Sequence, residues 1–274
     1  MTIGIIGLGL MGGSLGLALQ KNLDAKFVGF DYNQLHCQEA KKLGLVDEIV
    51  TFEEIKKCDV IFLSIPVESI INTLQDLKDV SSETTIIDLG STKEKIVELT
   101  PKAIVQNVVA AHPMAGTEMF GPKAAVLDLY EGKTVVLCNI ERNGTLHKDR
   151  AIELFTKLMM NIVYMDAKDH DVHAAYISHL PHAISYALAN SVLEQEDPKS
   201  ILALAAGGFR GMSRIAKSSP DMWSDVFKQN RKNLLSSLDS FELELSKVKK
   251  MVEDEDYDSL KEWMQVATTL HKIF

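Results

Sequence analysis

Residues 110–118, Ala-Ala-His-Pro-Met-Ala-Gly-Thr-Glu, contain the side chain best suited to chemistry in this sequence. An apolar run over residues 105–111 predicts a buried strand, so His112 stands at its carboxyl end, where open α/β sheets place their ligands. Pro113 cannot donate to a strand ladder and ends the strand, while Gly116 allows a backbone turn. His112 is therefore a candidate general base, although a histidine can equally serve as a polar cap on a strand end.

A serine follows another predicted strand, over residues 84–88. The sequence there continues Leu-Gly-Ser-Thr-Lys, with Ser91 at the entry to a helix. Ser91 fits an N-cap, with Glu94 three residues later completing a capping box. Alternatively, its hydroxyl projects into the same cleft as His112 and assists it.

A glycine-rich turn near the start of the chain predicts a dinucleotide site. Residues 2–20 read as a β-branched strand, a glycine turn and a helix, and the glycines fit G-x-G-x-x-G. In this motif the first glycine makes the tight turn, the second admits a pyrophosphate and the third packs helix on strand, with the helix N-terminus holding the diphosphate. The residues assigned to this contact are Gly7, Leu8, Gly9, Leu10, Met11 and Gly12.

The second predicted strand, residues 26–30, ends at Asp31, which lies 19 residues after Gly12. A carboxylate there accepts hydrogen bonds from a ribose and repels a 2′-phosphate, which favours NAD over NADP. Ser64 and Pro66 follow a buried strand over residues 59–65 and could line the adenosine side of the cleft. Ordinary turn chemistry explains those two residues equally well.

The alternation of elements predicts a doubly wound (Rossmann-type) parallel sheet in an α/β fold. Beyond residue 166 no strand pattern remains and the chain reads as helices with short breaks. We therefore expect an NAD-binding domain over residues 1–166 and a helical substrate-binding and dimerisation domain over residues 167–274. The remaining predicted elements are strands over residues 48–51, 134–138 and 161–165 and helices over residues 33–43, 68–77 and 147–159.

Four histidines lie on the first predicted helix of the second domain, residues 170–194, which Pro181 should kink. Neither Cys nor Glu completes a recognisable ligand set, so we expect no metal. His182 could instead donate a hydrogen bond to substrate from the face turned toward the cleft. A surface histidine or an interface contact is the alternative.

Residues 206–217 form the only locally basic stretch, with three glycines and three cations. Arg210 and Arg214 are four residues apart and would lie on the same face if this stretch is helical. The planar guanidinium of arginine suits a substrate carboxylate. A solvated loop is the other interpretation. Farther along, an apolar stripe is either core or a seam for a second subunit, and we expect a homodimer. It comprises Leu234, Leu238, Phe241, Leu245, Val248 and Val252.

Composition limits the classes of function. The 274 residues carry a net charge of −9 without a basic cluster, which argues against nucleic-acid binding. Three widely spaced cysteines suggest neither a disulfide framework nor a redox pair. The longest apolar run, residues 60–67, is too short to cross a bilayer, and the first strand leaves no room for a signal peptide. We expect a cytoplasmic protein without membrane contact.

Five motifs in this order resemble the prephenate dehydrogenase family over essentially the whole chain. They are Gly-Leu-Gly-Leu-Met-Gly-Gly-Ser at residues 7–14, Asp-Leu-Gly-Ser-Thr-Lys at 88–93, His-Pro-Met-Ala-Gly-Thr-Glu at 112–118, Ser-His-Leu-Pro-His at 178–182 and Gly-Phe-Arg-Gly-Met-Ser-Arg at 208–214. The first is shared by many dehydrogenases, whereas the next three in combination are specific. The chain resembles a monofunctional form, without a fused mutase or regulatory domain.

The resemblance implies a role for each matching residue. His112 matches the catalytic histidine and Ser91 its partner at the substrate hydroxyl. His182 and Arg214 match positions that hold the substrate side chain and ring carboxylate. The pocket wall or entrance is matched by Thr117, Glu118 and Trp223. The chain departs from the pattern at Gly211, where many relatives have Asp.

By the same resemblance, the activity is oxidative decarboxylation of prephenate to 4-hydroxyphenylpyruvate with reduction of NAD, in tyrosine biosynthesis. Arogenate, with an amine in place of the keto group, is the alternative substrate. A β-hydroxyacid dehydrogenase shares the opening glycine motif, but the motifs around His112 and His182 argue against it. A catalytically inactive NAD-binding regulator is the alternative from another functional class.

Overall fold

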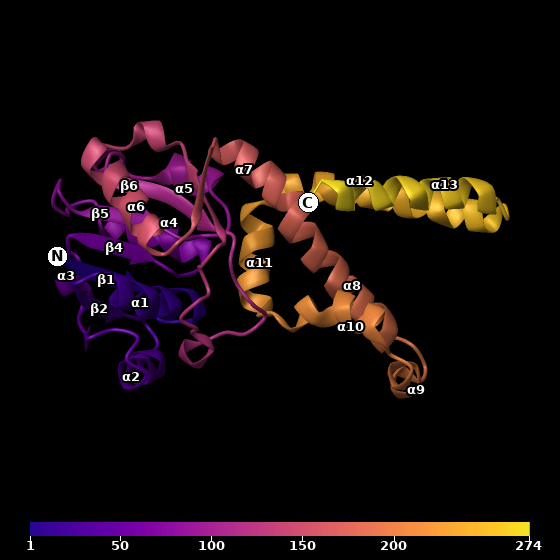
Figure 1. Ribbon diagram of the computed structural model, residues 1–274, viewed down its shortest axis with the longest axis horizontal. Helices are drawn as coiled ribbons and strands as arrows, with labels where there is room; N and C mark the ends of the chain where they lie inside the picture. The colour runs from indigo at the N-terminus through magenta and orange to yellow at the C-terminus, as the bar shows by residue number, and fades with distance from the viewer. Residues whose placement is uncertain (274) are drawn as a thin grey trace. The chain divides into compact units, whose positions relative to one another are not determined.

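The computed structural model describes residues 1–273, and the chain divides into two compact units, Met1–Asn230 and Arg231–Phe274 (Figure 1). The first unit combines the sheet with the helices that follow it up to residue 230. The second is a helical hairpin. This division into compact units differs from the functional boundary expected at residue 166, because helices on both sides of that boundary contact one another.

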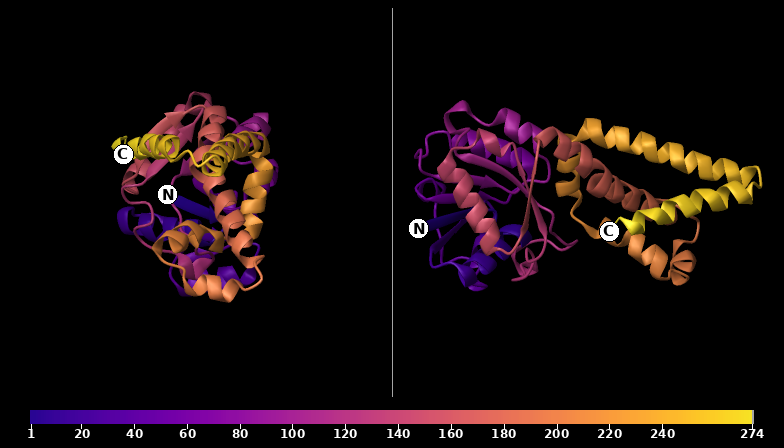
Figure 2. Two further views of the ribbon diagram at one scale, coloured as in Figure 1. Left: turned by 90° about the vertical axis from the view of Figure 1, so that its right-hand side faces the viewer. Right: turned by 45° about the horizontal axis from the view of Figure 1, so that its top comes forward.

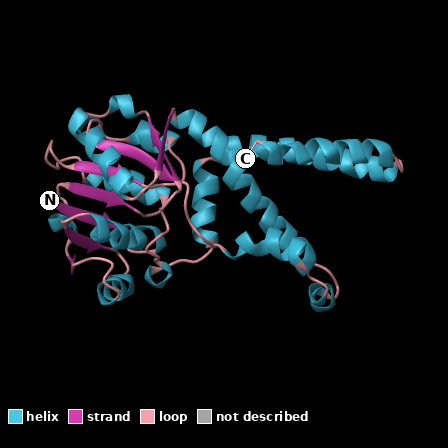
Figure 3. Ribbon diagram, in the orientation of Figure 1, coloured by secondary structure: helices cyan, strands magenta, loops and turns pink. Residues whose placement is uncertain are grey.

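The first unit is built on one eight-stranded sheet, drawn in magenta in Figure 3. Its spatial order is β3-β2-β1-β4-β5-β6-β7-β8, so the direction of winding reverses between β1 and β4. Ligands of such sheets bind at this reversal, outside the carboxyl ends of the strands. The strands are β1 (Thr2–Ile6), β2 (Lys26–Phe30), β3 (Glu48–Ile49), β4 (Val60–Leu63), β5 (Thr85–Asp88), β6 (Val108–Pro113), β7 (Thr134–Cys138) and β8 (Asn161–Met165).

All eight strands were expected, and the doubly wound α/β class is confirmed, but one neighbouring pair is not parallel. β7 runs antiparallel to β6, with His112 opposite Val136. The connecting residues 114–133 hold only a short 3-10 turn, Pro122–Ala124, and no crossover helix. Without a crossover the chain returns beside β6 in the opposite direction. This connection therefore starts at the same edge of the sheet as His112.

Helices cover both faces of the sheet, and each face has its own apolar core. On one face α1 (Leu10–Asn22), α2 (Gln34–Lys42) and α6 (Thr145–Lys157) pack on residues such as Ile5 and Val109. On the other face α3 (Phe52–Ile55), α4 (Val67–Asp76) and α5 (Glu94–Leu99) pack on residues such as Ile61 and Ile86. Burial on both faces explains why the central strands read as continuous apolar runs.

After β8 the first unit contains only helices, as expected. The helix predicted from residue 170 onward is interrupted by a π-helical turn, Ala175–His179, just before Pro181. It separates α7 (Ala167–Ala174) from α8 (Leu180–Leu193), and such turns often occur at functional sites. The later helices are α9 (Pro198–Ala203), α10 (Gly207–Ser213), a 3-10 turn (Arg214–Lys217) and α11 (Pro220–Gln229).

The second unit consists of α12 (Arg231–Glu253), α13 (Tyr257–Thr268) and a short 3-10 turn (Thr269–Lys272), with the two long helices side by side (Figure 2). Trp263 Nε1 donates to Glu244 Oε2 across the hairpin at 2.8 Å. The sequence also predicts a helix over residues 259–274. In the structure the last long helix begins at Tyr257, and Phe274 lies outside the described residues. None of the described helices combines the length and apolar composition needed to cross a bilayer.

Candidate active site

The glycine turn between β1 and α1 has the close approaches that the motif requires. Gly7 has φ +91°, and a Cβ there would lie 2.3 Å from the carbonyl oxygen of Ser64. A Cβ on Gly12 would lie 1.9 Å from the carbonyl oxygen of Gly7. In contrast, nothing stands within 4 Å of a Cβ on Gly9. The turn is thus tightly packed against neighbouring backbone at Gly7 and Gly12, and it is open at Gly9, where a pyrophosphate would approach.

The start of α1 fits an anionic ligand as well. Gly9 is its N-cap residue and offers no side chain to the first backbone N–H groups, which therefore remain available to a phosphate. At the end of β2, Asp31 Oδ2 accepts from Leu8 N at 2.9 Å and Oδ1 accepts from Asn33 N at 2.8 Å. The Asp31 carboxylate lies directly beside the glycine turn, which is the position required of a residue that binds the ribose hydroxyls of the nucleotide. The residues present fit an NAD molecule.

Ser64 and Pro66 lie at the same edge of the sheet. Ser64 N donates to the carbonyl oxygen of Ile6 at 2.8 Å, which continues the pairing of β4 with β1, and Pro66 is the N-cap residue of α4. Ser64 is half-buried and Pro66 exposed. Both residues therefore flank the reversal point of the sheet, where they were predicted.

His112 is the penultimate residue of β6, and only 9% of its surface is exposed. Its Nδ1 lies 2.8 Å from Nε2 of His170, which α7 provides from the beginning of the helical segment. Burial, followed by electrostatic interactions with His170, Lys93 and His179, holds the pKa of His112 well below its usual value. The ring is therefore neutral near pH 7, which is the protonation state of a base.

The network continues from His170 to a carboxylate. His170 Nδ1 lies 2.8 Å from Asp171 Oδ1. Both carboxylate oxygens of Asp171 also accept from backbone amides, those of Lys93 at 2.7 Å and Glu94 at 2.9 Å. One buried carboxylate thus connects the ring beside His112 with the chain segment that follows Ser91.

The capping box predicted for Ser91 is wrong. α5 begins at Glu94, its N-cap residue is Lys93, and Asp171 from α7 satisfies the first amides in place of a local side chain. Ser91 lies in the turn between β5 and α5 and is half-buried. Its hydroxyl is therefore not committed to a capping bond with this helix, which leaves the interpretation as a partner of His112.

His179 and His182 have different surroundings on either side of Pro181. His179 is fully buried, accepts at Nδ1 from Asn230 Nδ2 at 3.1 Å, and has no partner at Nε2. His182 is half-buried and stacks on Trp223, with ring centroids 3.5 Å apart and planes at 21°. His182 is thus the more accessible of the two histidines.

The expected donor role of His182 does not fit its hydrogen bond. His182 Nδ1 lies 2.9 Å from the carbonyl oxygen of Ser178, which can only accept, so Nδ1 carries the proton. Burial lowers the pKa of His182 and favours its neutral form, in which Nε2 is an acceptor. The neutral ring can therefore receive a hydrogen bond from a substrate, whereas donation would require the imidazolium.

Arg214 begins the 3-10 turn after α10 and contacts the segment that follows β6. Its Nη1 donates to Glu118 Oε2 at 2.8 Å, and more than half of its side chain remains exposed. Thr117 Oγ1 in the same segment accepts from Met119 N at 3.1 Å. Arg210 donates instead to the carbonyl oxygen of Ala205, so the two arginines diverge. α10 continues through Gly211 without interruption.

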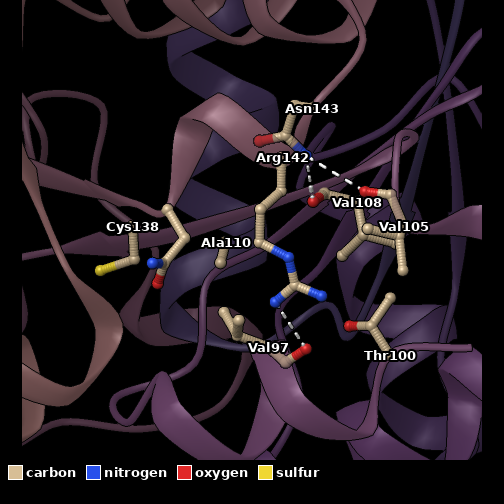
Figure 4. Close-up of a pocket in the computed structure, with 9 residues that line it drawn as sticks. Val97, Thr100, Val105, Val108, Ala110, Cys138, Arg142 and Asn143 are labelled. Atoms are coloured by element: carbon tan, nitrogen blue, oxygen red, sulfur yellow. Dashed lines mark hydrogen bonds between the residues drawn. The ribbon is translucent and has the colours of Figure 1, made fainter. Parts of the chain in front are cut away.

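A small cavity lies beside the amino-terminal end of β6 and is unrelated to this chemistry. Its volume of about 10 Å³ is roughly that of one water molecule, and none of the predicted site residues lines it (Figure 4). Asn143 Nδ2 donates to Val108 O at 2.6 Å and Val105 O at 3.3 Å, and Arg142 donates to Val97 O at 3.0 Å. The two bonds of Asn143 fix the start of the strand that carries His112.

Titratable side chains do not form a metal site in the described part of the chain. No group of three or more His, Cys, Asp or Glu residues with ligand geometry is found among residues 1–273. His170 and His179 belong to the hydrogen-bond network described above. The three cysteines, Cys37, Cys58 and Cys138, are free and buried.

Comparison with protein families identifies the family to which this chain belongs. The family model of the prephenate dehydrogenase nucleotide-binding domain matches residues 15–164, and that of the prephenate dehydrogenase dimerization domain matches residues 166–266. The chain belongs to the prephenate dehydrogenase family. A prephenate dehydrogenase of Bacillus subtilis is 31% identical over 97% of this chain and 74% of its own length.

Solved structures of the prephenate dehydrogenase family have the same fold. The prephenate dehydrogenase of A. aeolicus in complex with hydroxyphenyl propionate and NAD+ aligns with a TM-score of 0.92 and 30% identity, covering 100% of this chain and 98% of that one. An arogenate dehydrogenase of Synechocystis aligns with a TM-score of 0.81 and 27% identity, covering 99% of both chains. The chain is an NAD-dependent dehydrogenase of this family.

Sequence reasoning missed three residues of the site. His170 was only one of the four histidines on the predicted helix over residues 170–194, without a role in the site, and Asp171 and Lys93 were not singled out. The signal that could have pointed to His170 and Asp171 is an adjacent His-Asp pair just after the last strand, which the topology returns to the edge of the sheet. Their contacts join segments 58 and 78 residues apart, which a local pattern does not indicate.

Proposed function

We propose that the chain converts prephenate to 4-hydroxyphenylpyruvate and CO2 while reducing NAD, in tyrosine biosynthesis. The observation that carries this proposal is the buried, neutral His112 at the carboxyl edge of the same sheet as the glycine turn. A dehydrogenase of this kind requires a base and a nucleotide site at one cleft. The family assignment and the relatives named above support the substrate.

The chemistry of prephenate makes clear what each residue has to do. NAD, when bound, accepts the hydride from C4 of the cyclohexadienol ring. His112 takes the proton of the C4 hydroxyl as the C4 hydride leaves. The C–C bond to the ring carboxylate then breaks, CO2 leaves, and the bonding electron pair passes through the ring to the C4 oxygen, which takes the proton back from His112 as the ring becomes aromatic. Aromatisation supplies the driving force, so the protein has to position the substrate and provide a base that is neutral at the working pH.

The substrate is a dianion, and the residues around the cleft suit it. Arg214 is exposed and can turn its planar fork from Glu118 toward a carboxylate. Trp223 and the ring stacked on it, His182, supply a flat surface and an acceptor nitrogen. We assign Ser91 to the substrate hydroxyl beside His112, and Thr117 and Glu118 to the entrance.

Arogenate is the second candidate substrate, since the Synechocystis arogenate dehydrogenase shares this fold. The two substrates differ by an amine or a keto group on the side chain, so the same base and nucleotide site serve both. A catalytically inactive regulator would bind NAD without turnover, and the intact set of Ser91, His112 and Arg214 argues against it.

The test is NADH formation, followed by absorbance, with purified protein and prephenate or arogenate, each with NAD or NADP. We expect turnover of prephenate with NAD. Preference for arogenate would keep the mechanism and change the order of steps in the pathway. The absence of NADH with every pair, in a protein that binds NAD, would replace the proposal by the regulator.

Assembly and organisation form a separate part of the proposal. We assign nucleotide binding to residues 1–166 and substrate binding and dimerisation to residues 167–274, with homodimers formed through the helical segment. The second unit leaves large apolar side chains exposed, among them Leu243, Leu245 and Val266. A second copy of the chain is the partner that the dimerization-domain match supports. We place the enzyme in the cytoplasm, without nucleic-acid or membrane partners.

A further inference from the structure

We propose that Asp171 and His170 are positioning residues that set the tautomer of His112 and stabilise its protonated form during turnover. This inference rests on the proposed role of His112 as the base. Its starting point is a continuous chain of buried contacts, Asp171 to His170 to His112, with both links 2.8 Å long. The three side chains are each at most 9% exposed.

The positions of the protons in the contacts between Asp171, His170 and His112 follow from the Asp171 carboxylate. The Asp171 carboxylate accepts from two backbone amides and has no hydrogen to donate. His170 Nδ1 must therefore carry the proton of the bond to Asp171. In the neutral ring His170 Nε2 is then an acceptor, so the proton of the next bond belongs to His112 Nδ1.

The consequence for His112 is a lone pair on Nε2. A neutral imidazole with its proton on Nδ1 can take a proton only at Nε2, and Nδ1 is already engaged with His170. When Nε2 receives the hydroxyl proton, the positive charge is stabilised through His170 by the Asp171 carboxylate. The ammonium of Lys93 also lowers the pKa of His112, and the Asp171 carboxylate opposes that effect.

Asp171 links the base to the other proposed catalytic residue. Its bonds to the amides of Lys93 and Glu94 hold the end of the turn that carries Ser91. The same carboxylate thus fixes the orientation of His170 and the entry to α5. Buried groups with all their hydrogen bonds satisfied have little freedom to reorient.

The chain offers a discriminating pair of substitutions at one position. In His170→Gln the amide oxygen replaces Nε2 as acceptor and the amide nitrogen replaces Nδ1 as donor, so the order of protons is preserved. In His170→Leu both bonds are lost while the site remains filled. We expect kcat of His170→Leu to fall about 10- to 100-fold with KM for prephenate changed less than about twofold, the scale of lost orienting bonds. His170→Gln should retain most of kcat.

The direct readout is the protonation of each ring nitrogen of His112, measured by NMR on 15N-histidine-labelled protein. The signals of the eight histidines can be assigned from single substitutions. We expect a protonated Nδ1 in the wild-type protein and in His170→Gln, and a mixture of tautomers in His170→Leu and Asp171→Asn. Asp169→Asn, an exposed neighbour on α7, is the matched control and should change neither signal nor rate.

Three outcomes would overturn the inference. They are a wild-type His112 protonated on Nε2, an unchanged kcat in His170→Leu, and a His170→Gln variant as slow as His170→Leu. If Asp171→Asn fails to fold because α5 loses its cap, the His170 pair still decides. The NMR measurement does not depend on turnover, so it separates failure of this inference from failure of the proposed substrate.

Discussion

Lys93 donates from its buried ammonium to the carbonyl oxygen of Ala111, the residue before His112, at 2.7 Å. The same ammonium forms an ion pair with Asp88 at the end of β5, and both side chains are fully buried. Burial raises the pKa of the Asp88 carboxyl, and the charge of Lys93 opposes that shift. One cation therefore ties two neighbouring strands together at the edge of the sheet where the base stands.

Replacing Lys93 by Met should destabilise the fold, because it leaves the Asp88 carboxylate buried without its partner. We expect a loss of about 3–5 kcal/mol in the free energy of unfolding, the usual cost of breaking a buried pair. Urea denaturation measures it. The exposed Lys102→Met should have no comparable effect, and adding Asp88→Asn to Lys93→Met should recover part of the loss. Equal stability of the single variant and the wild type would contradict the pairing.

The nucleotide site was predictable because its signals are local. Close backbone approaches require glycine at positions 7 and 12 of one turn, the absence of a side chain at Gly9 leaves that turn open, and Asp31 directly follows the next strand. The strands were found for a similar reason, since apolar runs between turns mark buried strands whatever their partners. The direction of β7 was not found, because periodicity contains no information about strand direction.

The network around His112 could not be found in this way. The cap of α5 comes from Asp171, which is 77 residues from Glu94 in sequence, so the local pattern of Ser91 and Glu94 suggested a capping box that does not form. His182 was singled out, but the sequence did not indicate that its Nδ1 bonds to the Ser178 carbonyl oxygen, because that acceptor is a backbone group that every residue possesses. Donation to a substrate by the neutral ring does not fit this bond. Residue types predicted His112 and His182, whereas His170 and Asp171, the partners of His112, follow only from the tertiary structure.

His112→Asn should lower kcat with prephenate by at least about 10²-fold, the scale of losing a general base. Asn cannot take up the hydroxyl proton, whereas the nucleotide contacts around Gly9 and Asp31 remain as they are. The affinity for NAD, measured by titration calorimetry, should change little. His173→Asn, at an exposed position of α7, is the control. A near-normal kcat would remove His112 from the role of base.

Acid should destabilise the folded enzyme through its buried histidines. Burial lowers the pKa of His179 to about 4 from an unfolded value of 6.5. Above pH 6.5 neither state binds the proton, and below it the unfolded chain gains the proton first, so stability falls as the pH drops from 6.5 toward 4. The contribution of His179 should reach about 2 kcal/mol near pH 5, since one pKa unit is worth about 1.4 kcal/mol.

The comparison that isolates this effect is wild type against His179→Gln, unfolded by urea near pH 7.5 and near pH 5. The variant removes the titrating ring, so its stability should depend less steeply on pH than that of the wild type. Burial also lowers the pKa values of His112 and His147, and both contribute equally to the two curves. Parallel curves for the two proteins would show that His179 does not couple folding to pH.

Arg214→Ala should raise KM for prephenate, because we propose that Arg214 binds a carboxylate of the substrate. The value of kcat should change less, since Arg214 takes no part in the transfer of the hydride or the proton. We expect about a tenfold or larger rise, equivalent to about 1.4 kcal/mol of binding free energy. Steady-state kinetics at saturating NAD measures it. Arg210→Ala, whose guanidinium donates to Ala205 O instead, is the matched control. If both substitutions raise KM equally, the effect is one of general charge and not of a specific contact.

Asp31 should decide between the two nicotinamide nucleotides. Its carboxylate lies beside the glycine turn, where a ribose 2′-phosphate would meet a negative charge. Asp31→Asn keeps an acceptor for Leu8 N and removes the charge, whereas Asp31→Ser also loses the bond that holds the turn. We therefore expect the ratio of kcat/KM for NAD over NADP to fall about tenfold or more in both variants, with activity on NAD reduced further in Asp31→Ser. An unchanged ratio in Asp31→Asn would mean that shape, and not charge, excludes the phosphate.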